Sequence, residues 1–82
     1  MAEQLIGTVS HWFGNISVAG IDLSGPLAVG DRILIKGHTT DFEQAVSGMQ
    51  IDRQEVTEAG AGDSVGIVME SRVRVGDQVF KA

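Results

Sequence analysis

The segments Val29-Gly30-Asp31-Arg32-Ile33 and Val75-Gly76-Asp77-Gln78-Val79 repeat one pattern, and Ala61-Gly62-Asp63-Ser64-Val65 is a looser third copy. In each copy the glycine can adopt turn conformations that other residues resist, and the aspartate can accept hydrogen bonds from nearby backbone N–H groups. The pattern therefore predicts three turns, each at the start of a β-strand. Such turns, without a long amphipathic helical stripe, favour a small closed or nearly closed β-barrel that leaves no long sheet edge exposed.

Outward from these turns, short apolar segments rich in Val and Ile predict the strands of an all-β domain. The expected strands cover residues 4–12, 15–23, 31–36, 42–52, 65–70 and 78–81, with a short, less regular piece at 56–59. The alternation slips at Gly48, which predicts a bulge or a barrel corner. Gly14, flanked by Asn15, is expected to supply positive φ in a tight first hairpin.

One helical alternative starts at Thr40. The pattern Thr40-Asp41-Phe42-Glu43 fits a capping box, which can open a helix. The residues that follow show no 3.6-residue period, so the strand interpretation is preferred.

Length and composition restrict the class of protein. The 82 residues suit one domain, which we place at residues 1–82. The 11 acidic against 6 basic residues give a net charge of -5, which opposes tight, nonspecific DNA binding. With no cysteine, the chain holds no disulfide, zinc–thiolate site or thiol nucleophile. Without an export signal or an apolar run of about 18 residues, we expect a cytoplasmic protein with no membrane partner.

Four segments, taken in chain order, carry a resemblance to a known family. They are residues 6–11 (IGTVSH), 26–33 (PLAVGDRI), 46–51 (VSGMQI) and 58–67 (EAGAGDSVGI). Together they resemble the second domain of translational GTPases such as elongation factor Tu, over about residues 6–80. The resemblance implies a six-stranded antiparallel Greek-key β-barrel. In that family the barrel follows a GTP-binding domain and helps to contact the aminoacyl end of tRNA or ribosomal RNA.

The sequence departs from that family in one respect. It contains no G-x-x-x-x-G-K-[ST] motif, so nothing in it cradles a triphosphate, and GTPase activity is not implied. We therefore expect a freestanding barrel that is not an enzyme and that binds no cofactor.

The segment His11-Trp12-Phe13 lies at the mouth of the first predicted hairpin and contains the only tryptophan. Aromatic side chains at such a place can stack on unpaired bases or form the centre of a protein contact. In the alternative interpretation, Trp12 or Phe13 simply fills one end of the barrel.

Residues 72–75 (RVRV) alternate charged and apolar side chains. In a strand this pattern would place Arg72 and Arg74 on one face and both valines inside. The two guanidiniums could then bind phosphates, or they could be ordinary solvated surface that balances nearby carboxylates. The other basic residues that could extend the patch are Arg32, Lys36 and Lys81.

The loop at residues 37–42 carries His38 among residues that hydrogen-bond readily. It could be a binding loop, or its threonines and Asp41 could satisfy their own turn and leave His38 solvated. A metal site formed by His11 and His38 with Asp31 or Asp41 lacks ligand spacing, so no metal is expected.

Catalytic groups are also not expected. Ser10 and His11 are neighbours, and adjacent strand residues point to opposite faces, so they are not expected to act as nucleophile and base. No third group that would orient the histidine is apparent from the sequence.

The leading hypothesis from the sequence is a non-catalytic module that contacts tRNA, ribosomal RNA or a ribonucleoprotein. The expected binding residues are His11, Trp12, Phe13, His38, Arg72 and Arg74. The alternative is a protein-interaction or assembly module that docks on a GTPase or an enzyme supplied by another chain. That alternative predicts an exposed apolar patch. The sequence does not indicate an oligomeric state.

Overall fold

A computed structural model describes residues 4–82 of the chain, and within this range it contains strands, turns and loops but no helix. The strands are β1 (Gln4–Phe13), β2 (Val18–Leu23), β3 (Leu27–Ala28), β4 (Arg32–Lys36), β5 (Asp41–Ala45), β6 (Met49–Ile51), β7 (Gln54–Val56), β8 (Glu58–Ala59), β9 (Ser64–Val68) and β10 (Gln78–Lys81). The all-β prediction is confirmed. Residues 4–82 accordingly include no helix long and apolar enough to cross a membrane.

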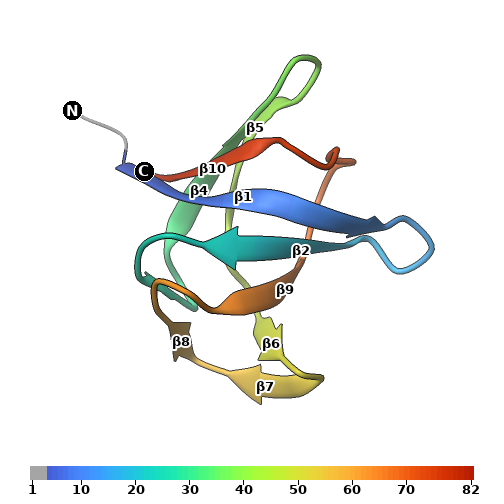
Figure 1. The fold of residues 1–82 in the computed structure, drawn as a ribbon. Helices are drawn as coiled ribbons and strands as arrows, with labels where there is room; N and C mark the ends of the chain where they lie inside the picture. Colours follow the sequence, from blue (N-terminus) through green and yellow to red (C-terminus); the bar gives the residue numbers. More distant parts are fainter. Residues whose placement is uncertain (1–3) are drawn as a thin grey trace.

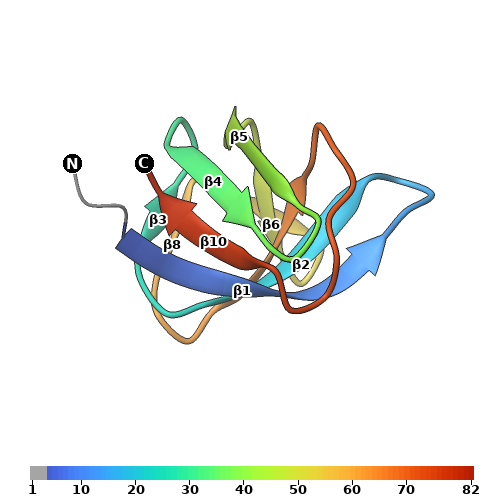
Figure 2. The ribbon, with the colours of Figure 1, turned by 90° about the horizontal axis from the view of Figure 1, so that it is seen from above.

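Eight strands form one antiparallel sheet in the order β5-β4-β10-β1-β2-β9-β6-β7, and β3 pairs with β8 in a separate ribbon. The sheet is strongly curled (Figure 1), and the view from above shows the same curvature (Figure 2). Because β5 and β7 each have a partner on one side only, the sheet is a curled half-barrel rather than a closed ring. The six-stranded Greek-key barrel expected from the sequence is therefore not confirmed.

The three predicted turns all form, and they share one geometry. Gly30, Gly62 and Gly76 have φ angles of 98°, 92° and 96°. In each turn the aspartate N–H donates to the carbonyl three residues earlier at 3.1 Å, as in a type II turn. The carboxylate of the same aspartate accepts from the N–H of that earlier residue, at 2.9 to 3.0 Å. The prediction of three strand-starting turns is confirmed.

Each turn is also tied to a buried residue far away in the sequence. The glycine N–H donates to the carbonyl of that residue at 2.8 to 2.9 Å, and the N–H of that residue donates back to the aspartate carbonyl at 2.8 Å. The three buried residues are Val46, Leu23 and Val9, for the turns at Gly30, Gly62 and Gly76 respectively. These reciprocal bonds fix where β4, β9 and β10 begin relative to the rest of the sheet.

The core lies on the inner side of the curled sheet, where alternate residues of the strands point. Its buried apolar residues are Ile6, Val9, Ala19, Ile21, Leu23, Leu27, Ile33, Ile35, Val46, Met49, Val65, Ile67, Met69, Val73 and Val79. Most of them are β-branched, and such side chains pack well on a pleated surface. The outer side is left free to carry polar groups and binding surfaces.

A glutamine side chain joins β5 to the chain that follows β9. Gln44 is 2% exposed, its Nε2 donates to the carbonyl of Val68 at 2.9 Å, and its Oε1 accepts from the N–H of Glu70 at 2.8 Å. The side-chain amide thus pairs with backbone groups as a peptide unit of a neighbouring strand would. This contact closes one side of the half-barrel without a continuous ladder.

Two strand predictions need correction. The segment expected as one strand at 42–52 is divided into β5 and β6, and the break contains Gly48, where a corner was expected. Thr40 is followed directly by β5, so the helical alternative is wrong. Residues 72–75 form a loop in which Val73 is buried but Val75 is 65% exposed, so the strand alternation predicted there fails at Val75.

The first hairpin also differs from the prediction. Its residue with positive φ is Ser17, at 55°, rather than Gly14. Gly14 has a different role, because a Cβ added there would lie 3.2 Å from Nε1 of Trp12. The glycine leaves room for the indole ring.

Candidate functional site

A β-bulge in β1 decides which way the aromatic segment points. The pairing of β1 with β2 slips between Val9 and His11, which leaves Ser10 as the extra residue. Beyond the bulge Trp12 packs partly buried against the core, whereas His11 and Phe13 are exposed on the outer face. The predicted binding segment is thereby divided between the two sides of the sheet.

The bulge also brings Ser10 and His11 together. Oγ of Ser10 lies 3.2 Å from Nδ1 of His11, so the prediction that they point to opposite faces is wrong, because it assumed unbroken alternation. The hydroxyl also donates to the carbonyl of Gly20 at 3.2 Å. Within residues 4–82 no carboxylate hydrogen-bonds to the His11 ring, so the pair lacks the orienting group of a serine nucleophile.

The outer face of the sheet contains a groove of about 590 Å³ across β1, β2, β9 and β6. Three of these strands, β1, β2 and β9, lie side by side in Figure 1. The floor of the groove contains Gly20 and Gly66, which lie opposite each other in the β2–β9 ladder. Because neither residue has a side chain, the groove floor is open backbone.

Aromatic and polar side chains surround this floor. The rings of His11 and Phe13 stack with centroids 6.0 Å apart and planes 9° apart. At another side Oγ of Ser64 donates to Oδ1 of Asp22 at 2.7 Å. The groove therefore combines an apolar, planar wall with hydrogen-bonding groups, which is typical of ligand sites.

The tight turn between β6 and β7 forms the remaining rim of the groove. Asp52 and Arg53 occupy it, with φ angles of 51° and 66°. A two-residue hairpin with positive φ at both positions corresponds to a type I′ turn. Aspartate tolerates that conformation well, but arginine adopts it rarely.

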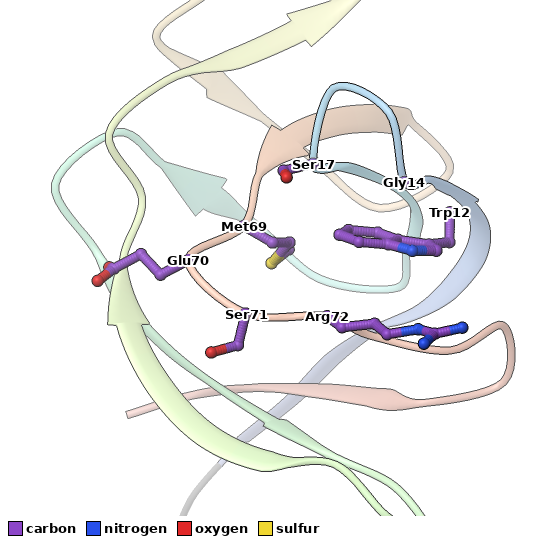
Figure 3. A pocket seen from close by; sticks show the side chains of 7 residues that line it. All are labelled: Trp12, Gly14, Ser17, Met69, Glu70, Ser71 and Arg72. Atoms are coloured by element: carbon purple, nitrogen blue, oxygen red, sulfur yellow. The ribbon is translucent and has the colours of Figure 1, made fainter.

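A second hollow, of about 400 Å³, lies between the first hairpin and the chain after β9. Figure 3 shows its lining residues, Trp12, Gly14, Ser17, Met69, Glu70, Ser71 and Arg72, with the Met69 side chain beside the indole and Arg72 running past it. The structure therefore brings Trp12 and Arg72 together, as the sequence hypothesis required, but on a different surface from His11 and Phe13.

The other two predicted residues lie on two adjoining loops. His38 is exposed in the short loop between β4 and β5, where the N–H of Gly37 donates to the carbonyl of Thr40 at 2.7 Å. This loop packs on the turn that contains Arg74 and Asp77, since a Cβ added to Gly37 would lie 1.9 Å from Oδ1 of Asp77. His38 and Arg74 line neither the groove nor the hollow.

The three basic side chains that could have extended the patch of Arg72 and Arg74 have local partners instead. Arg32 pairs with Glu43, Nζ of Lys81 lies 3.2 Å from Oδ2 of Asp31, and Lys36 lies 5.7 Å from the centre of the Phe80 ring. In the part of the chain that the structure describes, no group of three or more His, Asp or Glu side chains could hold a metal ion.

The groove on the outer face was not predicted from the sequence. Its floor residues, Gly20 and Gly66, each occupy an outward position in an alternating strand, and a glycine there leaves a gap in the surface. The two outward glycines could have been noticed in the sequence, but the pairing of their strands, which makes them neighbours, could not.

Comparisons with known proteins relate the chain to peptidases. No family model matches it. A protein of Methanocaldococcus jannaschii named as an uncharacterized protease is 42% identical over 76 residues, which is 92% of this chain and 19% of that protein. The chain thus spans about a fifth of the length of this curated relative.

Two solved structures share the fold. The C-terminal domain of a putative U32 peptidase from Geobacillus thermoleovorans matches with a TM-score of 0.91 and 15% identity, over 96% of this chain and 92% of that one. The selenomethionine variant of that domain gives the same TM-score and identity, over 95% and 99% of the two chains. The curled, strand-rich sheet is therefore a known small-domain fold.

The matches overturn the resemblance to the second domain of translational GTPases. The sequence match is to a protein named as an uncharacterized protease, and the fold is that of a putative U32 peptidase domain, so the predicted contacts with tRNA, ribosomal RNA or a ribonucleoprotein lose their basis. The physical reason lies in the segments at 26–33 and 58–67, which contain two of the three aspartate-locked turns. Such turns occur at the starts of strands in many small sheets, so they do not indicate the family of a protein.

Proposed function

We propose that this chain is a non-catalytic domain that docks on the catalytic part of a U32-type peptidase. The observation that carries the proposal is the 42% identity across nearly the whole chain to a fifth of a much longer protease. The U32 peptidase domain with the same fold is described as C-terminal, which supports a role beside a separate catalytic part.

The side chains of residues 4–82 support a non-catalytic role. The Ser10–His11 pair has no orienting carboxylate, and no metal-ligand cluster occurs within residues 4–82. On this proposal the peptidase chemistry belongs to the four-fifths of the relative that this chain does not match. The protein-interaction alternative from the sequence agrees with this arrangement.

The hollow beside Trp12 is the surface that we assign to docking. Tryptophan and arginine are among the residue types enriched at the centres of protein interfaces, and partly buried Trp12 lines this hollow together with Arg72.

The proposal is tested by measuring binding of this chain to the Methanocaldococcus jannaschii relative from which the matching region has been removed. We expect a one-to-one complex by calorimetry, weakened at least about tenfold by Trp12→Ala. Val29→Ala, an exposed apolar residue outside the hollow, is the control and should bind as the unchanged chain does. A truncated relative that is folded by circular dichroism but does not bind would contradict the proposal.

A further inference from the structure

The glycine at position 66 is not required by the fold. Its φ lies outside the left-handed region, and an added Cβ would meet Cγ1 of Val18 at 3.4 Å and the carbonyl oxygen of Gln50 at 4.0 Å, both ordinary contacts. Glycine in the middle of a strand weakens it, because it brings no side chain to pack and loses more backbone entropy. The missing side chain therefore has an effect outside folding, which is to leave the groove floor open.

The groove has the size and the lining of a binding site. Its volume of about 590 Å³ falls within the range of about 300–1,000 Å³ that ligand sites occupy. A planar ring can lie flat on the backbone of Gly20 and Gly66, against the parallel pair His11 and Phe13. Val18, next to this floor, adds aliphatic surface.

The charged side chains on the rim of the groove have a net negative charge. Asp22 and Asp52 contribute two carboxylates against the one guanidinium of Arg53, in a chain whose net charge is -5. Within residues 4–82 neither Asp52 nor Arg53 forms a hydrogen bond or an ion pair, and Asp22 uses only Oδ1, for Ser64. Within the described residues neither carboxylate has a cationic partner, so both can pair with a cationic ligand group.

We propose that this groove binds an extended peptide segment through one aromatic side chain and a basic side chain next to it. The aromatic ring lies on the glycine floor, the basic group pairs with Asp22 and Asp52, and Arg53 donates to carbonyls of the peptide backbone. The inference rests on the proposed association with a peptidase and names the substrate class that this domain would hold: polypeptide with adjacent aromatic and basic residues.

The first experiment uses blocked, fluorescently labelled pentapeptides and the 82-residue chain. The central pair is Tyr-Lys, Ala-Lys or Tyr-Glu in otherwise identical peptides. We expect the Tyr-Lys peptide to bind at least about tenfold more tightly than the Ala-Lys peptide. Its advantage over the Tyr-Glu peptide should be several-fold and should shrink as salt is added. Equal affinity for all three peptides, or no binding, would overturn the inference.

The second experiment fills the groove without disturbing the fold. Gly66→Ala should fold with an unchanged or higher melting temperature, because it replaces a strand glycine where a Cβ has room. Gly66→Val adds the strand preference of a β-branched residue, and thermal denaturation checks that both variants are folded. Both variants should bind the Tyr-Lys peptide less tightly, and the loss of affinity should be larger for valine, about tenfold or more. Gln78→Val, exposed on β10 outside the groove, is the matched control and should bind normally. Unchanged binding by both Gly66 variants would refute the assigned site.

The charge assignment has its own variant. Asp52→Asn should reduce the affinity for the Tyr-Lys peptide a few-fold and should not reduce the affinity for the Tyr-Glu peptide. An equal loss for both peptides would contradict the proposed ion pair.

Failure of this inference can be separated from failure of the proposed function. Peptide binding without a complex with the truncated protease would refute only the docking role. A complex without peptide selectivity would refute only the peptide site, because Trp12 and Gly66 line different hollows.

Discussion

The carboxylate of Asp77 occupies the place where residue 37 would carry its β-carbon. A Cβ added to Gly37 would lie 1.9 Å from Oδ1 of Asp77 and 2.5 Å from its Cγ. Asp77 cannot move away easily, because it is 5% exposed and its Oδ2 accepts from the N–H of Arg74 at 2.9 Å. The loop between β4 and β5 therefore rests on the turn before β10, and this contact requires glycine for space rather than for backbone conformation.

Gly37→Ala should lower the free energy of unfolding by about 2 kcal/mol or more, because the methyl group displaces a buried, hydrogen-bonded carboxylate. Urea denaturation measures the change. Gly48→Ala is the matched control, since nothing lies within 4 Å of a Cβ there, and it should change stability by less than about 0.5 kcal/mol. Equal effects at the two positions would show that the contact with Asp77 is not as tight as described.

Asp77→Ala should destabilise the protein more than Asp63→Ala. Both carboxylates accept one backbone N–H at 2.9 Å, but Asp77 is buried and Asp63 is exposed. Asp77→Ala removes the partly buried acceptor of the Arg74 N–H, which should lower the free energy of unfolding by about 1–3 kcal/mol. In Asp63→Ala, water can replace the exposed carboxylate as the acceptor for the Gly60 N–H. Paired thermal and urea denaturation curves test the order, and a larger loss for Asp63→Ala would contradict it.

Gln44→Leu should destabilise the fold by about 2–4 kcal/mol, since it removes the partners of the Val68 carbonyl and the Glu70 N–H together. Hydrogen exchange at the Glu70 amide should become markedly faster. Gln44→Glu keeps an acceptor for Glu70 but loses the donor to Val68, so its amide at 70 should stay better protected than in the leucine variant. Native-like exchange in Gln44→Leu would show that the side chain does not close the sheet.

Gly30→Ala should lose about 1 kcal/mol through backbone strain alone, because its φ is 98° while nothing crowds a Cβ there. Gly30→Asn should lose less, since asparagine tolerates positive φ better than alanine. Denaturation of the two variants side by side provides the comparison. An alanine variant as stable as the asparagine one would indicate that the turn relaxes to a different geometry.

A structural feature could be predicted from the sequence where all the residues that produce it lie in one short segment. The turns at Gly30, Gly62 and Gly76 follow from a glycine that accepts positive φ and an aspartate one residue later that locks the turn, so their positions were predicted correctly. The resemblance to translational GTPases was wrong because turns of this kind occur in unrelated small sheets.

The candidate sites depended on information that no single segment holds. Regular alternation predicts one side for His11 and the other for Trp12, and the bulge at Ser10 exchanges them. Arg72 was expected beside Arg74, but burial of Val73 within a loop rather than a strand left Arg72 beside Trp12 instead.

The all-β class, the starts of β4, β9 and β10, and the apolar residues that can form a core follow from the amino-acid sequence alone, because periodicity and turn chemistry act over a few residues. Three features become visible only in the folded chain: Gly20 and Gly66 meet to form a groove floor, Gln44 joins β5 to the chain after β9, and Asp77 needs a glycine at position 37. Each of these depends on strand order and register, which are set when distant segments pack together.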